Sequence, residues 1–165
     1  MPGIRIAAAT EGDTPVILEM IRGLAEYERL AHICSATEEQ LRRTLFGAKP
    51  AAEVLIARED DAAIGFALFF PNYSTFLAQP GLYLEDLFVK PHARGRGAGL
   101  ALFRALAKIA FERGCGRLEW AVLDWNEPSI GFYKKLGAVA MDEWTTYRLT
   151  DDAMKRLASG CALTS

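Results

Sequence analysis

Glycine and arginine are concentrated in one short segment, Arg94-Gly95-Arg96-Gly97-Ala98-Gly99. The segment lies between a strand-like apolar run, residues 82–89, and a helix-like apolar run, residues 100–111. A glycine-rich turn that leads into a helix leaves the first N–H groups of the helix unpaired, and the helix dipole adds positive character there. Arginine adds full charge and planar donors that suit phosphate. This setting favours a binding site for a phosphorylated ligand over a merely basic surface turn.

Two adjacent carboxylates, Glu85 and Asp86, interrupt the strand-like run. The period of a strand places Glu85 on one face with Leu87, and Asp86 on the other face with Leu84 and Phe88. A buried carboxylate without a partner is costly or has its pKa raised. Each is therefore expected either to pair with a basic group or backbone donor, an explanation that weighs more for Asp86, or to face a cleft. In a cleft it would bind a cationic substrate or accept its proton.

Three further residues are candidates with open alternatives. Glu28 continues the apolar stripe of the first predicted helix, so it is either an exposed helix end or a second anion in the same cleft, with Tyr27 as filler or cleft wall. Asn126 can cap a helix that Pro128 opens, which would leave its amide available to a ligand. Tyr133 lies on that helix, and its spacing alone favours a core position.

Alternating elements must position these side chains. The patterns predict strands at 4–8, 53–58, 63–70, 82–89, 117–123 and 139–149, with residues 71–81 as a loop. They predict helices at 13–30, 37–46, 100–111, 128–136 and 151–158. An antiparallel meander followed by strand–helix–strand indicates an α/β fold with a mixed sheet and helices on both faces. The length of 165 residues predicts a single domain, 1–165.

Composition excludes several classes of protein. A net charge of −2 gives no overall basic field for nucleic acid. No apolar stretch approaches the roughly 20 residues that span a bilayer. Three widely spaced cysteines predict no disulfide framework and a cytoplasmic location, and His32 and His92 lack the neighbours of a metal site. We therefore expect no metal, membrane or nucleic-acid partner.

The segments together resemble the GNAT superfamily of acyl-CoA-dependent N-acetyltransferases. Arg94, Gly97 and Gly99 fit the family's pyrophosphate-binding pattern, Gln/Arg-x-x-Gly-x-Gly/Ala. The chain is similar over nearly its whole length to the diamine (spermidine/spermine) N-acetyltransferase branch. The matching segments are 82–89, 125–130, 132–134, Leu24-Ala25 and Tyr27-Glu28.

The resemblance implies a role for each matching residue. Tyr133 would be the general acid that protonates the departing CoA thiolate, and Glu85 would deprotonate the amine directly or through water. Residues that would bind acetyl-CoA are Leu87, Phe88, Val89, Arg94, Gly95, Arg96, Gly97, Ala98, Gly99, Leu100, Asn126, Glu127, Pro128, Ser129 and Tyr133. Residues that would contact the amine are Tyr27, Glu28, Glu85, Glu119, Trp120 and Ala121. The resemblance also implies a parallel central pair of splayed strands and a homodimer.

The implied function is acetyl transfer from acetyl-CoA to a small primary amine, such as a diamine, a polyamine or an amino acid like thialysine. The segment 30–36 lacks the acidic residues of polyamine enzymes, which weakens the case for a polyamine. Two alternatives remain. One is an acyl-CoA-binding regulatory module without turnover, which would release no thiol; the joint presence of Tyr133 and Glu85 argues against it. The other is a protein-lysine acetyltransferase, since a lysine side chain is also a cation.

Overall fold

A computed structural model describes residues 3–160 of the chain. Its contacts divide the chain into two compact units, Met1–Leu123 and Asp124–Ser165. Cys34 and Cys115 are free thiols, and Cys161 lies outside the described residues. Among the described residues, no helix has the length and apolar character that crossing a membrane requires.

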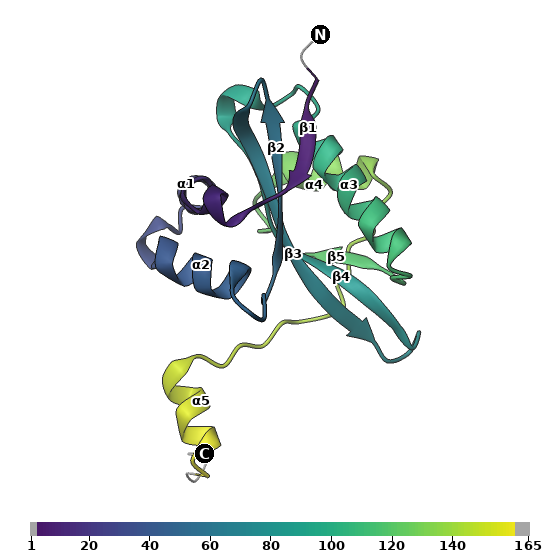
Figure 1. Cartoon of the computed structure of the whole chain (residues 1–165). Helices are drawn as coiled ribbons and strands as arrows, with labels where there is room; N and C mark the ends of the chain where they lie inside the picture. The colour runs from purple at the N-terminus through teal and green to yellow at the C-terminus, as the bar shows by residue number, and fades with distance from the viewer. Residues whose placement is uncertain (1–2, 161–165) are drawn as a thin grey trace. The chain divides into compact units, whose positions relative to one another are not determined.

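The first unit contains a five-stranded sheet (Figure 1). In spatial order its strands are β1 (Arg5–Ala8), β2 (Glu53–Glu59), β3 (Ala62–Ser74), β4 (Gln79–Val89) and β5 (Leu118–Trp120). The first four strands pair antiparallel, and β4 pairs parallel with β5. This confirms the predicted mixed sheet, with β5 as an edge strand of the described sheet.

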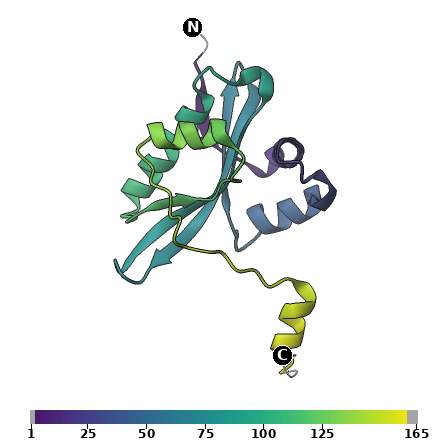
Figure 2. The same cartoon turned by 180° about the vertical axis from the view of Figure 1, so that it is seen from behind.

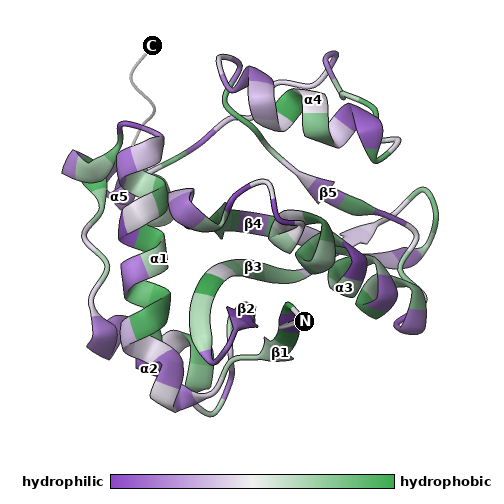
Figure 3. Ribbon diagram, turned by 90° about the horizontal axis from the view of Figure 1, so that it is seen from above, coloured by the Kyte–Doolittle hydropathy of each residue, from purple (hydrophilic) through white to green (hydrophobic). Residues whose placement is uncertain are grey.

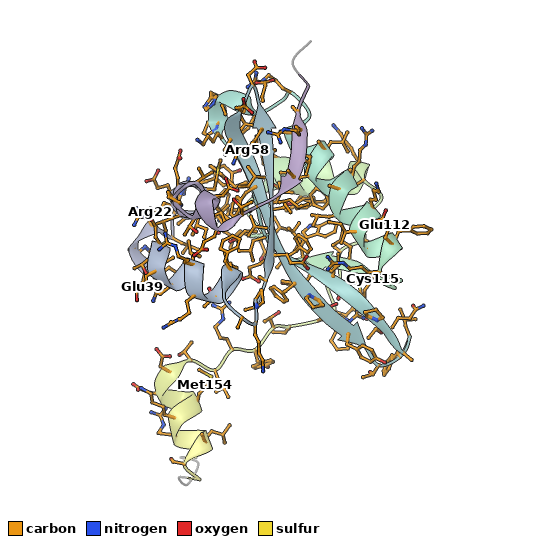
Figure 4. All side chains as sticks on the ribbon, viewed as in Figure 1. Arg22, Glu39, Arg58, Glu112, Cys115 and Met154 are labelled. Atoms are coloured by element: carbon orange, nitrogen blue, oxygen red, sulfur yellow. The ribbon has the colours of Figure 1, made fainter. Side chains whose placement is uncertain are left out.

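Helices cover both faces of this sheet. Figure 1 shows α1 (Thr14–Tyr27) and α2 (Glu38–Phe46) on one side of the strands and α3 (Ala98–Glu112) on the other. On the first side, Ile17 and Leu41 belong to a buried cluster with Phe66 and Phe88. Both layers are filled with side chains (Figure 4), and apolar (green) stretches mark α1 and α3 in Figure 3. The prediction of helices on both faces is confirmed.

Local signals set the helix ends as predicted, with one difference. The Thr37 hydroxyl accepts a hydrogen bond from the Gln40 N–H at 3.2 Å, and the Gln40 side chain accepts one from the Thr37 N–H at 2.9 Å. This capping box starts α2. Helix α1 ends at Tyr27 rather than near Leu30, because Arg29 adopts a left-handed φ of 61° that no α-helix continues through.

The predicted loop 71–81 is wrong, because most of it is strand. β3 and β4 continue as a long hairpin (Figure 2), and Pro71 pairs with Leu82 inside it. Proline is tolerated there because β2 pairs with β3 only as far as Phe69, so the other edge of β3 is open at Pro71. Turn-forming residues therefore predict the end of β3 too early, because proline is tolerated where β3 has a partner on one side only.

The predicted strand 139–149 is also wrong. The described part of the second unit contains α4 (Glu127–Lys135) and α5 (Asp151–Ala158), and residues 139–149 form no strand. The strand predicted at 117–123 is shortened to Leu118–Trp120. Apolar alternation shows that a segment suits a sheet, but a strand also needs a partner that supplies its hydrogen bonds.

We predict that Gly23→Ala destabilises the protein although alanine favours helices. A Cβ at Gly23 of α1 would lie 2.9 Å from the ring of Phe88, closer than real contacts allow. The overlap should cost about 1–3 kcal/mol. The matched control is Gly131→Ala in α4, where a Cβ meets nothing within 4 Å. The control should gain about 0.5–1 kcal/mol. Urea unfolding measures both, and a stabilised Gly23→Ala protein would contradict this packing.

Candidate functional site

Strand β4 contains a bulge at Glu85. Leu68 of β3 pairs with Asp86 and Phe69 pairs with Leu84, so Glu85 has no partner on β3. Asp86 therefore shares its row with Leu68, which packs against the core beneath α1. Leu84 shares its row with Phe69 and faces the opposite side. The predicted shared face of Asp86 and Leu84 is wrong, because a bulge adds one residue and shifts the alternation.

Carboxylates from β4 and from the end of α1 lie close enough to affect one another's charge. Burial, and then the charges of Glu85 and Glu28, together raise the pKa of Asp86 to about 6. Burial also raises the pKa of Glu28, the residue that follows α1. Within residues 3–160, the Asp86 side chain has no hydrogen bond or ion pair, so the pairing weighed for it from the sequence is absent. Glu28, Glu85 and Asp86 form one electronegative group, which we call the acidic cluster.

Glu119 of β5 extends this negative surface along the sheet. It pairs with Tyr83 in the parallel register, and Tyr83 stacks on Phe70 with ring centroids 5.3 Å apart. Burial, and then the charges of Glu85 and Glu119, raise the pKa of Tyr83. The Glu119 carboxylate is held by Arg117 Nε at 2.8 Å and by Asn72 Nδ2 at 3.2 Å. Because Phe70 and Leu68 lie two residues apart on β3, Glu119 faces the same side as Asp86.

The other residues expected near the amine are placed differently. Trp120 lies in the row of Leu84 and contacts Phe103 of α3 with ring centroids 5.0 Å apart, so it faces away from the acidic cluster. Ala121 is exposed just after β5. Of the two residues within β5, Glu119 shares a face with Asp86 and Trp120 does not.

The glycine-rich turn has the geometry that an anion site needs. Gly95 and Gly97 have φ values of 74° and 92°, which residues with a Cβ rarely adopt. Gly97 is the N-cap of α3, and no side chain caps the helix. The N–H groups of the first turn, at Ala98, Gly99 and Leu100, therefore remain available to a ligand. This backbone, with two arginines beside it, fits a pyrophosphate group.

The two arginines of the turn already have partners. Arg96 forms an ion pair with Glu59 at 2.7 Å. Arg94 Nε donates to the Val89 carbonyl at 2.9 Å, and its guanidinium lies over the ring of Tyr27. The carbonyl of Val89, one of the expected coenzyme contacts, is thus partly engaged.

One edge of β4 is open beside this turn. β5 pairs with β4 only at Leu82, Tyr83 and Leu84. No strand within residues 3–160 pairs with that edge of β4 from Glu85 to Val89, the part that includes Leu87 and Phe88. The two parallel strands therefore separate after a short contact, and the backbone of 85–89 can accept an extended ligand as an additional strand.

In the second unit, α4 is capped as predicted. The Asn126 side-chain oxygen accepts from the Ser129 N–H at 3.4 Å, and Pro128 lies in the first turn after Glu127. Asn126 is buried, so its amide oxygen serves the helix. Tyr133 is half-buried on α4, with its ring centroid 5.8 Å from that of Phe132.

A separate cleft of about 520 Å³ lies among α1, Glu38 and residues 88–92. Both signs of charge line it, and an ion pair joins Lys90 to Glu19 at 2.7 Å. It includes no member of the acidic cluster, and its mixed charge selects no ligand. Within the described residues, no group of histidine, cysteine and acidic side chains is arranged to hold a metal ion.

The missing partner of Asp86 predicts a specific pH dependence of stability. The folded chain keeps the Asp86 proton up to about pH 6, whereas the unfolded chain loses it near 3.8. Stability therefore falls as the pH rises through this window. Asp86→Asn, which never ionises, should exceed the wild type at pH 8 by at most about 3 kcal/mol, and the difference should vanish below about pH 3.

Urea unfolding across the pH range measures this difference. Asp142→Asn, at an exposed aspartate, is the matched control and should follow the wild type. If Asp86→Asn were less stable than the wild type at pH 8, the charged carboxylate would have a favourable partner.

Comparison with known proteins agrees with this geometry. The model of the acetyltransferase (GNAT) family matches residues 19–138. The chain is 38% identical to thialysine N-epsilon-acetyltransferase of Sus scrofa, over 96% of this chain and 99% of that protein. It is 35% identical to an L-ornithine N5-acetyltransferase of Arabidopsis thaliana, over 93% and 87% of the two chains.

Solved structures share the fold. An integron cassette protein from the mobile metagenome of V. cholerae has a TM-score of 0.79 and 28% identity, covering 94% of this chain and 97% of that one. A ribosomal-protein-alanine N-acetyltransferase from Brucella melitensis has a TM-score of 0.71 at 22% identity, covering 90% of this chain and 100% of that one, which shows the fold alone. From the family match and the long, similar relatives, the chain belongs to the GNAT family of acetyltransferases.

Proposed function

We propose that the chain transfers the acetyl group of acetyl-CoA to the side-chain amine of a small amino acid or to a diamine. The acidic cluster carries this proposal, since three carboxylates act on one another beside a strand whose open edge lies next to the glycine-rich turn. Relatives that are named for thialysine and ornithine support the substrate class. Residues 1–165 would act as one acetyltransferase domain.

The acidic cluster suits a cationic amine for two reasons. Unpaired negative charge attracts an alkylammonium ion, and this attraction weakens with salt. An ammonium with a pKa of about 10.4 must also lose a proton before it can attack. A carboxylate beside the bound amine can accept that proton directly or through a water molecule. Glu85, exposed at the bulge, is the proposed acceptor, and Asp86 and Glu28 hold the charge that keeps a cation beside it.

The coenzyme would be held by backbone more than by side chains. The first-turn N–H groups of α3 and the turn 94–97 would bind the pyrophosphate, and the open edge at Leu87 and Val89 would pair with the pantetheine arm. When bound, acetyl-CoA supplies an acetyl group activated as a thioester. A β4 N–H at this edge suits the acetyl carbonyl oxygen. Asn126, Ser129 and Tyr133 are the further residues that we propose as coenzyme contacts.

The favoured substrate is an amino acid with a side-chain amine rather than a long polyamine. The segment 30–36, Leu-Ala-His-Ile-Cys-Ser-Ala, has no acidic residue to hold distant charges. Spermidine/spermine N(1)-acetyltransferase-like protein 1 of Homo sapiens is also less similar, at 30% identity. A cytoplasmic homodimer is part of the proposal, and its size can be measured by light scattering.

A thiol-release assay with acetyl-CoA and a panel of amines tests this function. Thialysine, ornithine, lysine, putrescine, spermidine and a lysine-containing peptide form the panel. We expect fastest release with the free amino acids, and release should slow as salt rises. Fastest release with the peptide would indicate a protein-lysine acetyltransferase. Coenzyme binding without release for any amine would contradict the proposal and indicate a regulatory module.

We predict that Tyr133→Phe lowers kcat by about 10²–10⁴-fold, the usual contribution of a general acid, with little change in coenzyme affinity. The variant keeps the ring beside Phe132 and removes only the hydroxyl. Tyr147→Phe is the matched control, because Tyr147 is exposed and has no proposed role. Stopped-flow turnover and calorimetry with CoA give the two readouts. Unchanged turnover in Tyr133→Phe would remove Tyr133 from this role.

A further inference from the structure

We infer that Arg94 is a positioning residue that couples the coenzyme turn to the amine site through the ring of Tyr27. The inference rests on the proposed function, because it needs an anion at the turn and a cation at the acidic cluster. It gives Arg94 a second task besides the phosphate contact that its place in the turn suggests.

Arg94 joins three elements. Its guanidinium carbon lies 4.7 Å from the centroid of the Tyr27 ring, at the end of α1, and 5.6 Å from that of Phe88 in β4. Its Nε donates to the carbonyl of Val89 at 2.9 Å. One hydrogen bond and two contacts with aromatic rings thus hold the guanidinium.

These contacts leave the two terminal amino groups of Arg94 for a ligand. The guanidinium carbon lies over the Tyr27 ring, and the hydrogen bond to Val89 occupies Nε. The two terminal amino groups can still donate to a phosphate in the plane of the group. Arg94 can therefore bind an anion and stack on Tyr27 at the same time. Lysine could not do so, because its ammonium is not planar.

Tyr27 connects this contact to the acidic cluster. It is half-buried and directly precedes Glu28, whose charge raises the pKa of Asp86. Glu28 is the C-cap of α1, and its N–H donates to the Leu24 carbonyl at 2.9 Å, so its backbone is continuous with the turn that carries Tyr27. A pyrophosphate bound by the terminal amino groups would restrain Arg94 further and, through it, the Tyr27 ring and the adjoining Glu28. Coenzyme binding should therefore tighten amine binding, and the reverse, by one common factor.

A double-mutant cycle tests the coupling. The four proteins are the wild type, Arg94→Gln, Tyr27→Leu and the double variant, with Arg96→Gln as the matched control. Arg96→Gln removes the same charge from the same turn, but its partner is Glu59 and not a ring. The readouts are the KM for the best amine of the panel at saturating acetyl-CoA, and the Kd for CoA from calorimetry.

We expect Arg94→Gln and Arg96→Gln both to weaken CoA binding. Only Arg94→Gln should raise the amine KM, by about tenfold, and in the Tyr27→Leu background its effect should shrink to about twofold or less. Arg94→Lys should not restore the amine KM, whereas Tyr27→Phe should keep the coupling because it keeps the ring.

Two results would overturn the inference. An amine KM that is the same for Arg94→Gln and Arg96→Gln would leave Arg94 as a phosphate contact only. Additive effects of Arg94→Gln and Tyr27→Leu would mean that the ring does not transmit the effect. Both results leave the proposed function standing, since the wild type still turns over. A wild type that acetylates no amine would remove the proposed function and this inference together.

Discussion

The bulge at Glu85 is the feature on which the rest of the site depends. Without it, β4 would alternate regularly, and Asp86 would share a face with Leu84 rather than facing the α1 side opposite it. The additional residue leaves Glu85 without a partner on β3 just where β5 stops pairing on the other side. Strand β4 therefore contributes Phe88 to the core. A few residues earlier, at Glu85 and Asp86, the same strand presents carboxylates and backbone groups that pair with no β5 residue.

The acidic cluster costs stability, and the core around it offsets that cost. Asp86 lies partly buried, without a partner among the described residues, near two other carboxylates. Such a group destabilises the folded state unless it stays protonated. The closely packed layer of α1 and α2 against β3 and β4, with Phe66 fully buried, supports it. Unfavourable charge placed on a well-packed strand is typical of a site that binds an opposite charge.

Local signals in the sequence predicted most elements, and the failures have physical reasons. The capping box at Thr37 and the glycine turn before α3 act within a few residues, so the sequence alone reveals them. The bulge depends on how β3 and β4 align, which alternation within one strand does not encode. The contact of Arg94 with Tyr27 joins residues far apart in the chain, and no spacing rule reports it. Glu28 was a candidate from the sequence because a charged residue occupies the next position of the apolar stripe of the first helix.

Amide hydrogen exchange with and without CoA tests the central claim most directly. If the coenzyme lies along the open edge of β4 and on the turn before α3, two sets of N–H groups should exchange more slowly when CoA is bound: those of residues 98–100, and those within residues 85–89 that face the open edge rather than β3. The antiparallel pairs of β1 and β2, already hydrogen-bonded, should change little. Protection confined to other segments, with 85–89 and 98–100 unchanged, would contradict the account.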